Sequence, residues 1–350
     1  MIRIAIVGTG GMANAHADAF NKLKGCRLVA GVDVLEENLT RYCDKYEITN
    51  RFQNVKDLLA WGEFDAAVVA TIDSAHVSCA LPLVKAGKHV LCEKPIAPTA
   101  AEGKRLVTAA EKTGVINMIH FSYRNSSVLH HARKLVADGK LGRLMHIEAH
   151  YLQTWLTSPV WGEWRETPAW LWRLSTEHGS KGALGDLGVH IVDLATYVAN
   201  ENIKQVTCKL KTFPKAAGNQ IGEYKFDAND TALLQVELTG GCVGTINTTR
   251  WATGQINSLK LSLYGETGAL RLDLDKSNDE LEVCLGADVK NGQFKTVKVR
   301  KTPSMAERFL RSIRTGKNDD SNFRRGWEIQ RVLDASFRSD EQAKTIHIRT

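Results

Sequence analysis

Short apolar runs alternate with longer amphipathic segments along the first third of the chain. Strands are expected at 2–7, 27–33, 66–71, 89–92 and 115–120. Helices are expected between them, at 12–23, 35–46, 54–60, 76–86 and 99–113. Strands that alternate with helices in this way are typical of βαβ units and a parallel sheet. The pattern predicts an α/β domain over residues 1–122.

The pattern changes after a helical stretch at 127–138. Strands are expected at 143–152, 203–213, 230–239, 242–250, 258–264, 269–274, 280–285 and 294–299. Helices are expected at 183–199, 303–314 and 323–337, and Gly240-Gly241 is typical of a two-residue hairpin turn. Residues 123–350 therefore predict an α+β domain with a large, mostly antiparallel open sheet.

Composition places the chain among globular cytoplasmic proteins. Its 350 residues are enough for two domains, and 43% hydrophobic with 24% charged residues is ordinary. No apolar run approaches the roughly 18 residues of a membrane span, and no secretion signal precedes the first strand. The seven cysteines contain no C-x-x-C pair, which favours reduced thiols in a cytosol over disulfides or a zinc site. We expect no membrane partner.

The net charge of +7 could indicate a nucleic-acid-binding surface. Much of the excess lies in residues 300–350, where Arg308, Arg311 and Arg314 follow helical spacing. The pattern therefore favours a solvated helix face, and no nucleic-acid partner is expected.

A glycine-rich turn follows the first expected strand. Gly8-Thr9-Gly10-Gly11-Met12-Ala13 has the pattern G-x-G-x-x-A and opens a helix, which is the context of a dinucleotide-binding fingerprint. The glycines permit a tight turn and close approach of a pyrophosphate, which the first helix amides would bind. Asp33 ends the second strand and is placed to bind a ribose 2′-hydroxyl. Glu36 and Glu37 follow it without an arginine, so NAD is favoured over NADP.

Two further strands end in polar residues at the same predicted sheet edge. Lys94 follows one strand within Cys92-Glu93-Lys94-Pro95, and Thr71 ends another. Ligands of parallel sheets bind at the carboxyl ends of strands. Lys94 could hydrogen-bond a reacting hydroxyl and stabilise alkoxide character as hydride leaves. Alternatively, the Lys94 ammonium reaches solvent at a strand end, and Thr71 is a helix N-cap or turn residue.

Asp186-x-x-x-His190 lies within the expected helix 183–199, so the two side chains share one helix face. His190 could be a general base that Asp186 orients, because histidine titrates near neutral pH. A structural pair and a metal pair are the alternatives, although no third and fourth metal ligands stand out. Three glycines at the start of this helix would let a ligand approach its backbone: Gly182, Gly185 and Gly188.

Five of the eight tryptophans fall within one short stretch: Trp155, Trp161, Trp164, Trp170 and Trp172. Aromatic faces pack against the C–H faces of sugar rings, and indole N–H groups donate hydrogen bonds. Arg165 and Arg173 could add hydrogen bonds to hydroxyls. An oligomer interface or a loop core would use the same side chains, so these interpretations stay open.

These motifs, in this order, resemble the glucose–fructose oxidoreductase/inositol dehydrogenase (Gfo/Idh/MocA) family over nearly the whole chain. The resemblance is carried by the G-x-G-x-x-A turn, Ala70-Thr71 with His76, Glu93-Lys94-Pro95, Tyr123-Arg124 and the segment from Gly185 to Asp193. Ile72-Asp73 stands where the family usually has Pro-Asn. The family implies a Rossmann domain and a C-terminal domain whose open sheet often serves oligomerisation. A homo-dimer or homo-tetramer is therefore expected.

The resemblance also implies roles for individual residues. The implied catalytic set is Lys94, Asp186 and His190. The implied cofactor contacts are Gly8, Gly10, Gly11, Met12, Asp33, Thr71, His76, Glu93 and Lys94. The implied substrate contacts are Tyr123, Arg124, Trp155, Trp172, Arg173, Asp186 and His190. No metal is expected.

We therefore expect an NAD-dependent dehydrogenase that oxidises a secondary hydroxyl of a sugar, a sugar derivative or a cyclitol. The tryptophan-rich stretch is similar to members that act on pyranosides or anhydrosugars. One alternative is a glycoside-cleaving enzyme that recycles bound NAD, and net release of NADH would argue against it. The other is a non-catalytic ligand-sensing regulator, which would not need all three implied catalytic residues.

Overall fold

The computed structural model describes residues 1–348, which divide into two compact units. The first unit contains Met1–Ser122 and Pro303–Gln330. The second contains Tyr123–Thr302 and the segment from Arg331 onward. Residues 303–330 were expected in the second domain, but they pack with the first. Helix α10 (Phe323–Gln342) contributes residues to both units.

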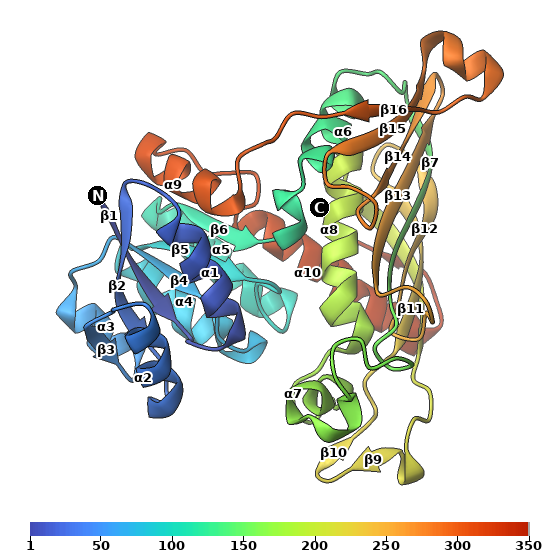
Figure 1. Ribbon diagram of the computed structural model, residues 1–350. Helices are drawn as coiled ribbons and strands as arrows, with labels where there is room; N and C mark the ends of the chain where they lie inside the picture. The colour runs from blue at the N-terminus through green and yellow to red at the C-terminus, as the bar shows by residue number, and fades with distance from the viewer. Residues whose placement is uncertain (349–350) are drawn as a thin grey trace. The chain divides into compact units, whose positions relative to one another are not determined.

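The described part of the first unit forms a six-stranded sheet in the order β3-β2-β1-β4-β5-β6 (Figure 1). The strands are β1 (Ile2–Val7), β2 (Cys26–Val32), β3 (Asn50–Phe52), β4 (Ala66–Val69), β5 (His89–Glu93) and β6 (Asn117–His120). Every neighbouring pair is parallel, so the carboxyl ends of the strands meet at one edge. This is the strand order of a Rossmann fold, which confirms the expected fold class. The short strand β3 was not expected.

Five helices connect these strands within the described residues. They are α1 (Gly11–Asn21), α2 (Glu36–Lys45), α3 (Val55–Trp61), α4 (His76–Lys85) and α5 (Ala100–Thr113). Local signals set the ends of α5, because the Thr99 side chain accepts from the Glu102 amide and Gly114 follows with φ +69°. The buried face of α1 carries Ala13 and Ala17, which pack in the apolar core of the unit.

The segment 303–330 completes the core of the first unit. Helix α9 (Met305–Thr315) places Phe309 against Phe20 of α1, with ring centroids 6.5 Å apart. Arg308 is buried, contrary to the expected solvated face, and its Nη2 lies 2.5 Å from Asp319 Oδ1. The expectation failed because this partner lies in the loop after the helix, outside the helical pattern.

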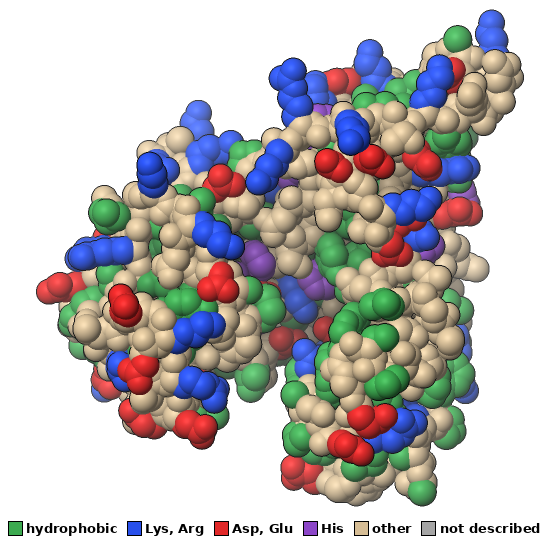
Figure 2. All heavy atoms as spheres, viewed as in Figure 1, with side chains coloured by type: hydrophobic (Ala, Val, Ile, Leu, Met, Phe, Trp, Pro, Cys, Tyr) green, Lys and Arg blue, Asp and Glu red, His purple; other side chains and the backbone are tan. Residues whose placement is uncertain are grey.

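Basic side chains elsewhere are mixed with acidic ones. Figure 2 shows Lys and Arg interspersed with Asp and Glu over the face that it presents. Arg311 and Arg314 are exposed, as the solvated-face interpretation predicts. Within residues 1–348, no helix is both long and apolar enough to cross a membrane.

The described part of the second unit forms a nine-stranded sheet in the order β16-β15-β14-β13-β7-β12-β11-β8-β17. The strands are β7 (Leu144–Gln153), β8 (Ile203–Lys211), β11 (Thr231–Leu238), β12 (Val243–Thr249), β13 (Asn257–Gly265), β14 (Gly268–Asp273), β15 (Glu280–Leu285), β16 (Lys295–Lys298) and β17 (Ile346–His347). Strands β7 and β12 pair in parallel, and the other neighbours are antiparallel. The expected, mostly antiparallel sheet is confirmed.

Two hairpins of the second unit differ from the expectation. The hairpin at Gly240-Gly241 has a three-residue loop, since Leu238 N donates to Cys242 O at 2.8 Å. A small hairpin of β9 (Gln220–Ile221) and β10 (Tyr224–Lys225) was not expected.

One helix-covered face of the large sheet carries the candidate site of the second unit. The helices of this region are α6 (Ser127–Ala137), α7 (Pro168–Leu171) and α8 (Val189–Ala199). Helix α8 contacts β7, β12, β13 and α6, and almost all of its residues are buried (Figure 1). Because it is covered on most sides, its sequence is nearly continuously apolar.

Candidate active site

The glycine-rich turn joins β1 to α1. Gly8 has φ +85°, and a Cβ there would lie 2.7 Å from the Ala70 carbonyl oxygen, so this position requires glycine. At Gly10 and Gly11, a Cβ would meet no described atom within 4 Å. Among residues 1–348, no side chain caps the start of α1, so its first amides are available to an anion. These features fit the pyrophosphate of a dinucleotide.

Asp33 follows β2 and is held beside this turn. Its Oδ2 accepts from the Thr9 amide at 2.7 Å and from the Thr9 hydroxyl at 2.8 Å. Its Oδ1 accepts from the Leu35 amide at 2.9 Å. Oδ1 therefore retains capacity to accept a ribose hydroxyl, because it takes only one of these three hydrogen bonds. Met12, on the first turn of α1, is 46% exposed at the same edge.

Lys94 follows β5 directly, at the carboxyl edge of the sheet where the sequence predicts it. It is half-buried, and its peptide bond to Pro95 is cis. His76 is fully buried, with Nδ1 2.6 Å from Pro95 O and Nε2 3.2 Å from Thr71 O. Because His76 ties two edge loops together beneath the surface, we leave it out of the proposed cofactor contacts. Thr71, in contrast, is half-buried at that edge.

A buried cluster of three titratable side chains lies beside the Lys94 backbone. His16 comes from α1, Glu93 ends β5 and His120 ends β6. Glu93 Oε1 lies 2.8 Å from His16 Nε2 and 2.8 Å from His120 Nδ1. The two imidazole rings meet edge to face, with centroids 4.5 Å apart. The Lys94 amide donates to Glu93 Oε2 at 3.3 Å. We call these three side chains the His–Glu–His cluster.

The protonation of the cluster follows from its surroundings. Burial alone would raise the pKa of Glu93, but the charges and hydrogen bonds of the two histidines outweigh it and hold that pKa well below its usual value. Burial, together with His120, lowers the pKa of His16. At neutral pH, Glu93 is therefore ionised and His16 is neutral.

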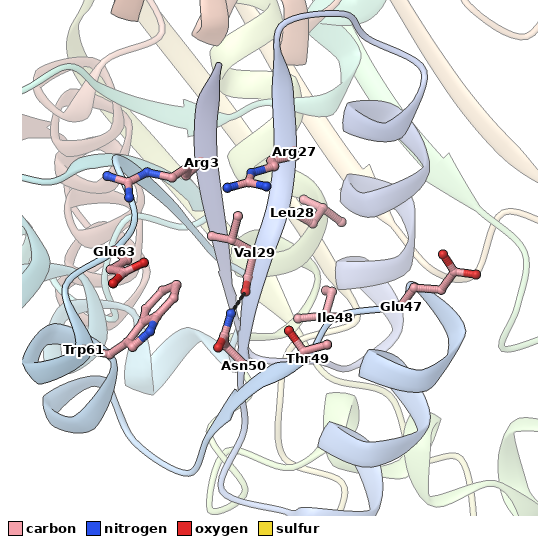
Figure 3. A pocket seen from close by; sticks show the side chains of 10 residues that line it. All are labelled: Arg3, Arg27, Leu28, Val29, Glu47, Ile48, Thr49, Asn50, Trp61 and Glu63. Atoms are coloured by element: carbon pink, nitrogen blue, oxygen red, sulfur yellow. Dashed lines mark hydrogen bonds between the residues drawn. The ribbon is translucent and has the colours of Figure 1, made fainter.

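A pocket of about 250 Å³ lies at the opposite, amino-terminal edge of the same sheet (Figure 3). Figure 3 shows Arg3 and Arg27 on the adjacent strands β1 and β2 at its rim. Arg3 is already paired with Asp65, at 3.0 Å. Dinucleotides bind outside the carboxyl ends of parallel strands, so this pocket is not the cofactor site.

Asp186 and His190 lie in the segment predicted as one helix. Leu184–Gly188 forms a π-helical turn that continues into α8, where His190 occupies the first turn. Such turns are frequent at functional sites. Asp186 Oδ2 accepts from Arg250 Nη2 at 3.2 Å and lies 3.9 Å from Arg173 Nε. Two arginines from outside the helix therefore hold this carboxylate.

The glycines at the start of this helix serve packing within the protein. A Cβ at Gly182 would lie 2.4 Å from the Asn229 side-chain nitrogen. A Cβ at Gly185 would lie 2.3 Å from Lys181 Cβ, and Gly188 is similarly close to a leucine of the same turn. The expectation that these glycines open the backbone to a ligand is therefore wrong.

Arg250 belongs to a group of four charged residues, three of which have fully buried side chains. Its side chain is 0% exposed, and its backbone amide donates to Asp230 O at 3.0 Å. Asp230 Oδ2 lies 2.9 Å from Lys215 Nζ, and both of these side chains are also 0% exposed. Burial lowers the pKa of Arg250 more than Asp186 and Asp230 raise it, and burial also lowers the pKa of Lys215. We call Asp186, Arg250, Asp230 and Lys215 the ion-pair group.

A polar network lies beside His190 on the helix-covered face of the large sheet. Tyr123 and Tyr151 share a hydrogen bond of 2.7 Å between their hydroxyls. The Tyr151 hydroxyl donates to Asn257 Oδ1 at 2.8 Å, and Gln153 Nε2 donates to both, at 3.0 and 2.8 Å. The ring of Tyr123 meets that of His190 edge to face, with centroids 5.1 Å apart. Burial raises the pKa of Tyr151, which therefore stays a neutral donor.

The tryptophan-rich stretch divides into a core and a more exposed part. Trp155 and Trp164 are each 2% exposed and pack in an apolar cluster with Phe226. Trp155 offers no open face to a sugar ring, so we leave it out of the proposed substrate contacts. Trp172 is half-buried, with the Arg173 guanidinium 4.6 Å from its ring centroid. For Trp155 and Trp164, the loop-core interpretation is the correct one.

Arg124 is also held by protein groups. It is 1% exposed, and its Nε and Nη2 donate to the two Asp193 oxygens at 2.8 and 2.6 Å. The Tyr197 ring centroid lies 4.0 Å from its guanidinium carbon. Because this pair anchors α8, we leave Arg124 out of the proposed substrate contacts as well.

Several polar residues of these clusters escaped the sequence analysis. His120 ends an expected strand at the edge that carries Lys94, so the same rule could have found it. His16 is a polar residue within the apolar stripe of α1, which is a weaker signal. Gln153 and Arg250 gain their partners through strand pairing and loop packing, and a single sequence does not reveal these.

Family comparisons agree with this geometry. Residues 2–121 match the family described as an oxidoreductase family with an NAD-binding Rossmann fold. Residues 129–271 match the GFO/IDH/MocA C-terminal domain. The two matches follow each other along the chain, one in each unit.

Individual relatives are dehydrogenases of sugars and cyclitols. Levoglucosan dehydrogenase of Pseudarthrobacter phenanthrenivorans is 25% identical over 85% of this chain and 80% of its own length. Myo-inositol 2-dehydrogenase of Thermotoga maritima is 23% identical over 78% of this chain and 75% of its own length. A solved levoglucosan dehydrogenase in complex with NADH and levoglucosan has a TM-score of 0.87 at 22% identity and covers both chains completely. This likeness shows that the fold is shared.

Proposed function

The chain belongs to the GFO/IDH/MocA family of NAD-binding oxidoreductases, and we propose that it oxidises a secondary hydroxyl of an anhydrosugar or pyranoside. It is an NAD-dependent dehydrogenase of a sugar, a sugar derivative or a cyclitol. The finer substrate class is supported by the similarity to levoglucosan dehydrogenase and by the indole of Trp172, which lies under a guanidinium.

The observation that carries the proposal is the position of Lys94. It follows β5 at the carboxyl edge of the same sheet whose first turn leaves the α1 amides available to a phosphate. The order β1-β4-β5 puts Lys94 on the far side of the glycine-rich turn from Asp33. If Asp33 binds the adenosine ribose, the nicotinamide half of the cofactor extends towards Lys94.

We assign one role to each residue of the implied catalytic set. Bound NAD supplies the hydride acceptor. His190 accepts the proton of the reacting hydroxyl as general base. Lys94 donates a hydrogen bond to the same oxygen and stabilises its developing negative charge. Asp186, fixed by Arg250, provides a carboxylate that orients His190.

The polar network beside His190 supports a polyhydroxylated substrate. Tyr123 and Asn257 offer hydroxyl and amide groups, which can donate to and accept from sugar hydroxyls. Arg173 and Trp172 offer a guanidinium and an indole, the pair that can bind a hydroxyl and the C–H face of a ring. We propose these four residues as the substrate contacts, together with Asp186 and His190.

We also propose that the protein forms a homo-dimer or homo-tetramer through the open face of the large sheet. Helix α8 covers the other face. The open face carries Gln235 and Asn247. Leu233 pairs with Asn247, lies two residues before Gln235 on β11 and is 50% exposed. Changing Leu233 to Glu should shift the protein to a smaller assembly in analytical ultracentrifugation. An unchanged sedimentation coefficient would contradict this interface.

A cytoplasmic location is part of the proposal. The described cysteines are all free thiols, and five of them are buried. Free thiols persist in reducing compartments. Fractionation of the producing cell should place the protein with cytosolic markers.

The function is tested by following NADH formation with free sugars, inositols, glycosides and anhydrosugars, using NAD and NADP in parallel. We expect net NADH with one compound class and NAD. The Lys94→Ala variant should lose about 10²- to 10⁴-fold in kcat and retain NAD binding. The control is Lys85→Ala, because Lys85 is an exposed lysine of the same unit. Near-normal turnover of Lys94→Ala would refute its assignment.

A further inference from the structure

The His–Glu–His cluster lies where the cofactor helix, β5 and β6 converge. The side chains of Glu93, His16 and His120 are 8%, 4% and 14% exposed. One ring nitrogen of each histidine lies 2.8 Å from Glu93 Oε1. Burying a carboxylate is costly unless donors satisfy it. Three donors from three segments do so here: two ring N–H groups on Oε1 and the Lys94 amide on Oε2.

The geometry favours hydrogen bonds over a bound metal ion. The three ligand atoms lie within 4.8 Å of one another, as a metal site would require. Ligands around a tetrahedral ion at about 2.0–2.2 Å would stand roughly 3.3 Å apart. Glu93 Oε1 is 2.8 Å from each ring nitrogen, which is a hydrogen-bond separation.

We propose that His16 and His120 are positioning residues that hold the Glu93 carboxylate and, through it, the backbone at Lys94. The two rings fix Oε1 from one side. Oε2 then accepts the Lys94 amide, so the strand end that carries the catalytic lysine is tied to the cofactor helix α1. This inference rests on the proposed role of Lys94.

The clamp requires a proton on the ring nitrogen of each histidine that faces Glu93. His16 must donate from Nε2, and His120 must donate from Nδ1, because these are the atoms that face Glu93. Side-chain ¹⁵N NMR of the cofactor-free protein at neutral pH measures this directly. We expect a proton on Nε2 of His16 and a proton on Nδ1 of His120. The reverse tautomer at either ring would overturn the proposal.

Amide side chains of different reach provide a matched set of variants. Gln places an N–H where His carries Nε2, and Asn places one where His carries Nδ1. His16→Gln and His120→Asn should therefore retain most of kcat. His16→Asn and His120→Gln place the same N–H group at the wrong distance from the backbone, so it cannot meet Glu93. These two variants should lose about tenfold to a hundredfold in kcat. The Kd of NAD, measured by fluorescence, should change little in all four variants.

Three outcomes would overturn the clamp. In the first, the Gln and Asn variants of each histidine lose kcat equally, which would show that the position of the N–H group does not matter. In the second, all four variants lose thermal stability but keep kcat, which would show a purely structural role. In the third, the purified protein carries a stoichiometric transition metal that Glu93→Gln loses.

Different variants test the proposed function and the clamp. If Lys94→Ala turns over normally, the proposed function fails and the clamp has no lysine to position. If Lys94→Ala is inactive while His16→Asn and His120→Gln are fully active, the proposed function stands and the clamp is wrong.

Discussion

The two units bury charge by different means. In the His–Glu–His cluster of the first unit, one carboxylate is satisfied by two histidine rings and a backbone amide. In the ion-pair group of the second unit, an arginine and a lysine face two aspartates, and Asp186 alone of the four side chains has appreciable exposure. Histidine can give up its proton when it is buried, whereas arginine stays charged. The first arrangement therefore satisfies its anion through hydrogen bonds, and the second depends on matched numbers of opposite charges.

This comparison predicts the largest loss of stability in the second unit. Changing Asp230 to Leu leaves the Lys215 ammonium buried without its carboxylate, which should lower the free energy of unfolding by about 3–5 kcal/mol. Urea denaturation measures the loss. The control is Glu266→Gln, because the Glu266–Arg143 pair is exposed and should contribute at most about 1 kcal/mol.

The double variant Lys215→Met with Asp230→Leu sharpens the same prediction. Removing both charges together should recover most of the lost stability, since an apolar pair of similar volume needs no desolvation. A double variant as unstable as Asp230→Leu would show that packing, and not the stranded charge, controls the site.

A smaller, functional effect is expected at Arg250. Its planar fork bonds both Asp186 and the Arg173 carbonyl, and lysine cannot reproduce that geometry. Arg250→Lys should lower kcat by about tenfold to a hundredfold while the KM for NAD stays unchanged. Arg271→Lys is the control, since Arg271 lies exposed on β14. An equal loss in both variants would contradict a specific role for Arg250.

The smallest effect concerns pH and the first unit. The pKa of His16 is lowered in the folded protein, so the unfolded chain takes up its proton first as the pH falls. His16 therefore stabilises the fold above its unfolded pKa of about 6.5, and this contribution is lost at lower pH by up to about 1.4 kcal/mol per pH unit.

Urea denaturation at several pH values between 7.5 and 5.5 tests this slope. His16→Gln should show a shallower loss of stability than the unchanged protein. His146→Gln, at a histidine whose side chain is 46% exposed, should show the full slope. Identical slopes in the two variants would refute the assignment to His16.

The sequence predicts the positions of strands more reliably than the partners of side chains. The expected strand 2–7 matches β1 residue for residue, and Lys94 follows β5 as expected. Both predictions depend on local properties, namely the spacing of apolar residues and the polar residue at the end of a strand. The strand β3 was missed, since three residues are too few to show a period. The π-turn at Asp186 was read as ordinary helix, because both have similar apolar spacing.

The site residues also differ in whether a local pattern or a distant partner determines their position. Gly8, Asp33 and Lys94 could be placed because each has a fixed offset from a strand end. Arg124 and Trp155 were expected to face a substrate, but pairing with Asp193 and packing in the loop core bury them. These contacts join segments distant in sequence, and their chemistry alone does not distinguish a buried partner from a bound ligand.

The return of residues 303–330 to the first unit has a consequence for synthesis on the ribosome. When Ser122 emerges, Phe20 still lacks Phe309, and the Ile119 amide lacks the Ser321 carbonyl that accepts it at 2.6 Å. Roughly 190 to 200 further residues must be translated before those partners appear, which takes roughly 10 to 40 seconds at typical rates. During that interval the nascent Rossmann sheet has an open edge and an uncovered apolar surface, which are features that chaperones bind.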